Sequence, residues 1–107
     1  EHAVVLTEDA AEGRGAGRGH LAMYLGLPNY TDNLVRLGFT ADDFADGGSD
    51  RLVDELVAWG TPDQIAAKVA AHHDAGADHV CIQVLPAAGR SVPEVWRALA
   101  PALVDAR

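Results

Sequence analysis

The chain has 107 residues, of which 49 % are hydrophobic, and its formal net charge is −8. This length is enough for one small domain, and the apolar fraction excludes an intrinsically disordered protein. The negative charge argues against a nucleic acid or an anionic membrane as a partner. A single cysteine excludes an internal disulfide, and no apolar run approaches the ~20 residues of a membrane span, so we expect a cytoplasmic chain.

The first half of the chain predicts one strand followed by a series of short helices. Residues 1–6 contain the apolar run Ala3 to Leu6, which is typical of a buried strand. The chain begins at Glu1 without a methionine, so we expect it to start partway through an ordered region. Residues 7–48 predict a helical excursion, and Thr7 is placed to cap its first helix. We expect that helix to be interrupted and flexible, since each of the four glycines from Gly13 to Gly19 costs it ~1 kcal/mol relative to alanine.

Residues 49–76 predict two helices with clear boundary signals. Ser49 is placed to cap the first, whose apolar stripe runs from Leu52 to Val57 and which Trp59-Gly60 closes. Thr61-Pro62-Asp63-Gln64 is a capping box with proline at the first helical position, and Gly76 is a natural terminator for the second helix.

The carboxyl-terminal part predicts a strand and one more helix. Residues 79–85 are the best strand of the sequence, and residues 91–104 begin with a second capping box. The order of strand, helices, strand and helix predicts an α/β fold with two parallel strands. Two parallel strands with bare edges do not form a stable sheet, so we expect further strands from elsewhere. They come either from the rest of a larger enzyme or from a second copy of a non-catalytic module that dimerises.

Several runs carry a resemblance to a known family. They are Trp59-Gly60-Thr61-Pro62-Asp63-Gln64-Ile65-Ala66, Asp74-Ala75-Gly76-Ala77-Asp78-His79-Val80, Ile82-Gln83, Tyr24-Leu25-Gly26-Leu27-Pro28-Asn29-Tyr30, Asn33-Leu34 and Leu37-Gly38-Phe39. The chain resembles the end of the luciferase-like monooxygenase superfamily, and within it a subgroup of coenzyme F-420-dependent oxidoreductases.

The resemblance implies that residues 1–107 are the carboxyl-terminal portion of one TIM (β/α)8 barrel, namely its last two β/α units. A complete barrel of this kind is about two to three times longer. By this likeness residues 1–6 are strand seven, residues 79–85 are strand eight and residues 91–104 are the final helix.

The implied activity is hydride transfer between F-420, or alternatively FMN, and a small organic substrate. In such enzymes the cofactor carries the chemistry and the protein orients it. The catalytic residues and most cofactor contacts would lie in strands outside this chain, so we expect the chain alone to be inactive and to bind no cofactor.

Two residues are candidates for cofactor contact. Alternation in the second strand places Gln83 on the face expected to line the barrel interior, near the carboxyl end where barrel sites form. The alternative for Gln83 is a glutamine that hydrogen-bonds neighbouring strands. Arg90, in the loop after that strand, is a candidate contact for a cofactor phosphate.

Other conspicuous residues favour structural roles. The glycine-arginine run from Gly13 to Gly19 fits neither a dinucleotide-binding loop nor an RNA-binding motif. Adjacent His72 and His73 point about 100° apart on a helix, so they cannot chelate one metal ion together and we expect them at the surface. Cys81 is expected to be a buried structural thiol. We also expect Trp59 and Trp96 to pack from helices against the strand layer.

The excursion over residues 7–48 is too long for an ordinary connection between a strand and its helix. One hypothesis makes it a lid or a partner contact, with Tyr24, Tyr30, Phe39 and Phe44 covering substrate or a second subunit. The alternative is local packing beside the last helices.

Overall fold

A three-stranded parallel sheet organises the chain. The computed structural model describes residues 1–104, and its strands are β1 (His2–Leu6), β2 (Val57–Gly60) and β3 (Ile82–Val84). The strand order is β2-β1-β3, with Ala3 opposite Val57 on one side and Gln83 on the other. The helices are α1 (Ala10–Leu21), α2 (Pro28–Arg36), α3 (Ala41–Phe44), α4 (Asp50–Leu56), α5 (Pro62–Asp74) and α6 (Val92–Val104), with 3-10 turns η1 (Tyr24–Gly26) and η2 (Ala45–Gly47).

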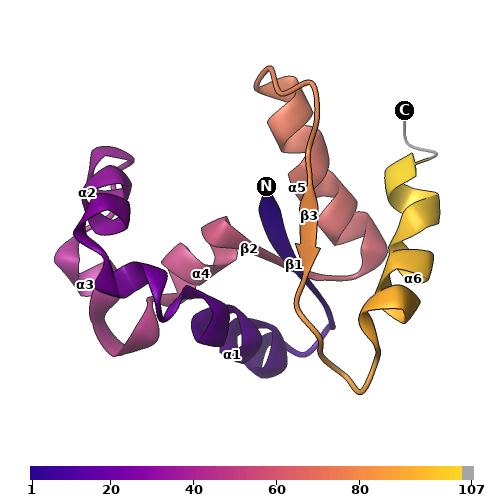
Figure 1. Ribbon diagram of the computed structural model, residues 1–107, viewed down its shortest axis with the longest axis horizontal. Coiled ribbons are helices and arrows are strands. Elements are labelled where there is room, and N and C mark those ends of the chain that lie inside the picture. The colour runs from indigo at the N-terminus through magenta and orange to yellow at the C-terminus, as the bar shows by residue number, and fades with distance from the viewer. Residues whose placement is uncertain (105–107) are drawn as a thin grey trace.

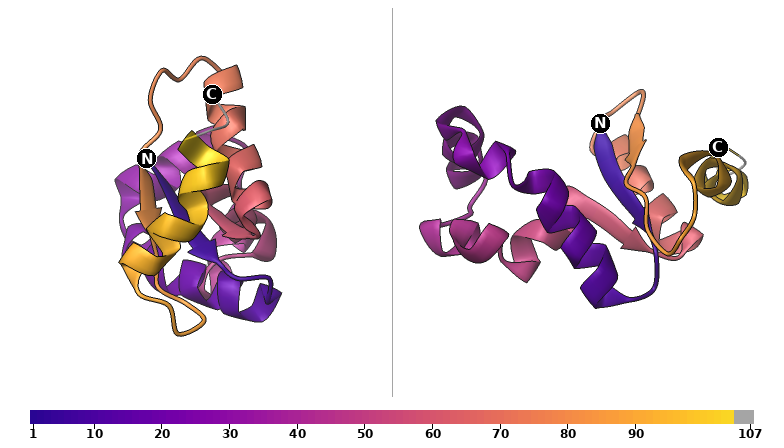
Figure 2. Two further views of the ribbon diagram at one scale, coloured as in Figure 1. Left: turned by 90° about the vertical axis from the view of Figure 1, so that its right-hand side faces the viewer. Right: turned by 60° about the horizontal axis from the view of Figure 1, so that its bottom comes forward.

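Helices cover both faces of this sheet (Figures 1 and 2). Alternate residues of β1 point to opposite sides, as in any strand. Val4 and Leu6 pack with Ile65 of α5 and Leu99 of α6. The other face, which includes Val5, packs against α1 and α4. The fold is therefore a mostly helical α/β arrangement in three layers, with α2 and α3 extending away from the sheet (Figure 1).

The strands are parallel, as predicted, but there are three rather than two. The sequence predicted a helix through Val57, and this is wrong beyond Leu56: Val57 and Ala58 are buried in β2, where they pair with Ala3 and Val4. If α4 continued for another turn, Val57 would extend the apolar stripe of the helix that begins at Leu52. The β-branched Val57 instead gains a place in the sheet, where both faces of the strand are covered.

The three layers differ from the interior of a TIM barrel. In a barrel the helices form an outer ring and the inner faces of the strands pack on one another, and strands consecutive in the chain are neighbours. Here α1 covers the face of β1 that a barrel would turn inward, and β1 lies between β2 and β3. β1 and β3 are adjacent and parallel.

Helix α1 is continuous over Ala10–Leu21, so the predicted interruption at the glycines is wrong. The glycines on one face permit close packing: a Cβ on Gly13 would lie 2.8 Å from Cβ of Trp59, and one on Gly17 would lie 2.9 Å from Cγ1 of Val53. Gly15 and Gly19 have open space around them. The helix begins with Asp9 as its N-cap, accepting from the Glu12 N–H, and not with Thr7 as predicted.

Three other boundary signals of the sequence are confirmed. Ser49 caps α4, Thr61 and Gln64 form the predicted capping box of α5, and Gly76 has a φ of 110° after that helix ends. Strand β3 is shorter than residues 79–85, although Cys81 and Leu85 still hydrogen-bond to β1. Its register places Ile82 opposite His2, so His79 and Val80 lie beyond the amino end of β1 and have no ladder partner there.

Candidate functional site

The carboxyl ends of the parallel strands form a cleft of about 370 Å³. It is lined by the loop after β1 (Thr7 and Glu8), the loop after β2 (Gly60 to Pro62) and the loop after β3 (Ala88 and Arg90). From β1 the chain continues to α1 on one face of the sheet, and from β2 it continues to α5 on the other face. Open α/β sheets bind ligands at such a point, outside the carboxyl ends of adjacent strands whose connections diverge.

Arg90 lines this cleft and carries a positive charge. Its position in the loop after the last strand agrees with the prediction from the sequence. The loop turns through two left-handed residues, Ala88 (φ 56°) and Gly89 (φ 69°). The Ala88 N–H donates to Oε2 of Glu12 at 3.3 Å, which ties the loop to α1. Within residues 1–104 the Arg90 guanidinium makes no ion pair, so it is available to an anion in the cleft.

Two of the backbone N–H groups at the amino end of α5, which borders the same cleft, are used by its capping box. The Gln64 N–H donates to Oγ1 of Thr61 at 3.2 Å, and the Thr61 N–H donates to Oε1 of Gln64 at 2.8 Å. Pro62, at the first helical position, has no N–H to offer. Arg90 is the side chain of the cleft that carries a positive charge, and Glu8 in the same lining carries a negative one.

Gln83 and Arg90 are not brought together. Gln83 lies opposite Ala3, towards the amino end of β1, and its side chain is exposed. The predicted alternation is correct, because Ile82 and Val84 pack against the α5 and α6 face and Leu85 packs on the other. The register separates Gln83 from the cleft, which begins at Leu6 at the opposite end of β1.

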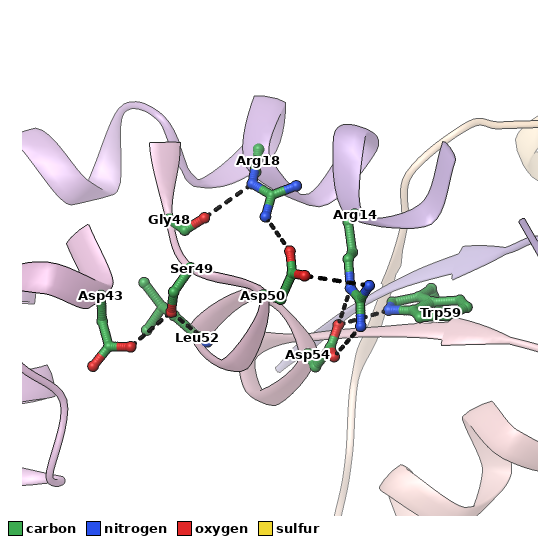
Figure 3. A network of polar contacts seen from close by, with 9 residues as sticks. All are labelled: Arg14, Arg18, Asp43, Gly48, Ser49, Asp50, Leu52, Asp54 and Trp59. Carbon is green, nitrogen blue, oxygen red and sulfur yellow. Dashed lines mark hydrogen bonds and ion pairs between the residues drawn. The ribbon is translucent and has the colours of Figure 1, made fainter. Parts of the chain in front are cut away.

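A network of ion pairs joins α1 to α4 and gives the glycine-arginine run its role (Figure 3). Arg14 binds Asp54 through two hydrogen bonds of 3.0 and 2.8 Å, and Arg18 binds Asp50 and the Gly48 carbonyl. Nε1 of Trp59 donates to the same Asp54 at 2.9 Å. The Arg14 hydrogen bond lowers the pKa of Asp54 below its usual value. The arginines are therefore used internally, in agreement with the exclusion of a phosphate loop or RNA-binding motif.

A second cluster surrounds Asp43, which sequence reasoning did not single out. Its carboxylate accepts from the Thr40 N–H at 2.9 Å, from Oγ of Ser49 at 2.7 Å and from Nη2 of Arg51 at 2.6 Å. These hydrogen bonds, from Arg51 first, hold the pKa of Asp43 far below its usual range. The signal was present as a capping box of Thr40 and Asp43, three residues apart. This cluster fixes the start of α4 and has a structural role.

Two other predictions fail because β3 and α6 lie at the margin of the fold. Cys81 is exposed and not buried, since it precedes the edge strand β3. Trp96 does not pack against the strand layer, because 55 % of it is exposed on the outer side of α6. Trp59 does pack in the core, but from β2 and not from a helix.

His72 and His73 of α5 are exposed, as expected, but His72 forms a hydrogen bond with the buried His2. Nδ1 of His2 lies 3.0 Å from Nε2 of His72, so one ring donates to the other. His2 is 8 % exposed, and its Nε2 has no hydrogen-bond partner within the described residues. Burial, and then the neighbouring His72, lower the pKa of His2 to about 4.

This pair predicts a pH dependence of stability. Protonation of His2 is favoured in the unfolded chain below its ordinary pKa of 6.5, and in the folded chain only below about 4. Stability is therefore complete above pH 6.5 and falls as the pH drops towards 4, by on the order of 2 kcal/mol. Urea denaturation of the wild type and of His2→Gln at pH 7.5 and 4.5 measures this. An equal loss in both proteins would show that His2 is not the group responsible.

Metal-ligand clusters and membrane-spanning helices were both sought in the described part of the chain. No three His, Cys, Asp or Glu side chains among residues 1–104 are placed to hold a metal ion. None of the helices within that range is both long and apolar enough to cross a membrane.

The chain matched none of the protein-family models, curated proteins or solved structures with which it was compared.

Proposed function

We propose that the chain is the carboxyl-terminal portion of a luciferase-like oxidoreductase that transfers hydride between F-420, or FMN, and a small organic substrate. The observation that carries the proposal is the pairing of β1 with β3, whose following loops line one cleft with Arg90. The loops after strands seven and eight of a TIM barrel frequently bind phosphate, and both cofactors carry a phosphate group. The family resemblance from Trp59 to Gln83 supports the same assignment.

The proposal has a structural consequence. In a closed barrel β1 would pair with the preceding strand along the edge that β2 occupies here, and its α1-covered face would turn towards the barrel interior. Both β2 and α1 would then occupy other positions in the complete enzyme. The cleft would then lose the lining that follows β2, Gly60 to Pro62, and the hydrogen bond between Ala88 and Glu12 of α1. The proposal retains the adjacency of β1 and β3, and the proposed role of this chain is to contribute the positive charge of Arg90.

Arg90→Ala in a longer protein that contains the preceding strands tests the role in cofactor binding. Loss of a charge-assisted hydrogen bond to the cofactor phosphate is expected to weaken F-420 binding at least about ten-fold. Arg97→Ala is the matched control, because Arg97 is an exposed residue of α6 that does not line the cleft. Fluorescence titration with F-420, and with FMN in parallel, measures both affinities. Equal affinity of the two variants would contradict the assignment of Arg90.

The 107-residue chain alone is the complementary test. With most of the cofactor contacts absent, it is expected to bind F-420 and FMN more weakly than micromolar. Micromolar binding by the purified chain would overturn the idea that it is only part of the site. A reading frame without barrel strands upstream of Glu1 would contradict the proposal as a whole.

The alternative is a non-catalytic interaction or assembly module that completes its sheet across two chains. It is favoured by the strand order, because β2 and β3 are both edge strands of the three-stranded sheet. Unpaired edges are templates for association with another chain. A symmetric dimer of the 107-residue chain, measured by light scattering after size exclusion, would support this module, and a monomer would exclude it.

A further inference from the structure

We infer that a second cavity, between α1, the η1–α2 segment and the amino end of β1, is a binding site for a small, uncharged, planar aromatic molecule. This cavity has a volume of about 340 Å³. It reaches Ala3 at the start of β1, whereas the carboxyl-edge cleft reaches Leu6 and Thr7 at its end. The two cavities are therefore separate. The inference concerns the 107-residue chain, because α1 would occupy another position in the complete enzyme of the proposed function.

The wall of the cavity is built from apolar side chains that the fold already holds in place. Leu21 of α1 and Leu34 of α2 line it and are 6 % and 8 % exposed, respectively. Leu25 and Leu56, from the segment after α1 and from α4, also line it and pack against the core. Leu37, which is 67 % exposed, lies at its edge. A pre-formed apolar cavity in the range of roughly 300–1,000 Å³ is the usual setting of a small-molecule site. At the lower end of this range it suits one or two rings.

An aromatic cluster gives the cavity its preference for planar ligands. The Tyr24 and Tyr30 rings lie with centroids 4.9 Å apart at an interplanar angle of 64°, and the His20 ring lies 5.5 Å from Tyr24. Tyr30 is 43 % exposed, so part of its ring surface is open to a further partner. Aromatic rings favour edge-to-face and offset contacts, and a third ring can extend this arrangement.

The polar groups around the cavity indicate an uncharged ligand that forms hydrogen bonds. His20, Asn33, Tyr24 and Tyr30 line it, so an imidazole, an amide and two phenols can hydrogen-bond a ligand. No lysine or arginine lines the cavity, and its one carboxylate is that of Glu1. A phosphorylated cofactor would find neither arginine nor lysine here, so the ligand class differs from that expected at Arg90.

The test uses 2-naphthol as a probe of the 107-residue chain, followed by amide chemical shifts in NMR. Saturable shifts confined to residues 20–37, the start of β1 and the region around Leu56 are expected. Tyr30→Ala should weaken binding about three- to ten-fold, because one aromatic pair is lost. Val35→Ala is the control, since Val35 lies on the same helix, is 54 % exposed and does not line the cavity. It should bind as the wild type does.

A second variant keeps the inference testable if Tyr30→Ala fails to fold. Asn33→Ala removes an exposed side chain from the lining and should weaken 2-naphthol more than naphthalene, which has no hydroxyl group. Three results would overturn the inference: shifts spread over the whole chain, equal loss of binding in Tyr30→Ala and Val35→Ala, or no saturable binding. None of these bears on Arg90, so failure here leaves the proposed function standing.

Discussion

Gly17→Ala is expected to destabilise the 107-residue chain by about 1–3 kcal/mol, the usual cost of overpacking a tight contact. The new methyl group would lie 2.9 Å from Cγ1 of Val53 and 3.4 Å from Cγ2 of Val57. Both valines are fully buried and cannot move freely. Gly13→Ala should behave in the same way, because its Cβ would lie 2.8 Å from both Cβ and Cγ of Trp59.

Gly15→Ala and Gly19→Ala are the matched controls on the same helix. Nothing lies within 4 Å of a Cβ at either position, so alanine should stabilise α1 by up to ~1 kcal/mol through its higher helix propensity. Urea denaturation followed by circular dichroism measures all four variants. Stabilisation by alanine at all four positions would show that α1 does not pack against α4 and β2, and would restore the flexible helix predicted from the sequence.

Leu99→Ala is expected to destabilise the chain by about 2–5 kcal/mol, whereas Trp96→Ala should have a small effect. Leu99 has no exposed surface and packs with Val4, Leu6 and Ile65, while Trp96 on the same helix is 55 % exposed. The larger residue is thus the less important one for the packing of α6. The same denaturation experiment compares the two variants.

A larger loss from Trp96→Ala than from Leu99→Ala would contradict this placement of α6. It would favour the sequence-based expectation, in which Trp96 packs against the strands. Leu103→Ala should fall between the two, because Leu103 is only partly buried against the same cluster.

Features determined by near neighbours in the chain could be predicted from the sequence. The capping box at Thr61 and the cap at Ser49 depend on groups within three residues, and both were predicted correctly. The position of Arg90 at the carboxyl edge followed from the prediction of a strand before it. Alternation in β3 likewise followed from the two-residue period of a strand.

Features determined by distant pairing could not be predicted. Val57 and Ala58 form a strand because β1, more than fifty residues earlier, offers a partner edge, and no local pattern reports this. The exposure of Cys81 depends on β3 being an edge strand, and the separation of Gln83 from the cleft depends on register. Gly13 and Gly17 have the local pattern of helix breakers. Their role in close packing depends on side chains of α4 and β2, which are distant in the sequence.

The cleft rests on the strand order β2-β1-β3, and the proposed function rests on the pairing of β1 with β3 within it. An NMR measurement of interstrand proton–proton contacts in the 107-residue chain tests it most directly. The parallel register predicts contacts between the backbones of Val5 and Trp59, and between those of Val4 and Val84. Contacts of β2 with β3, and none between β1 and β3, would mean the sequential order β1-β2-β3 and would contradict this account.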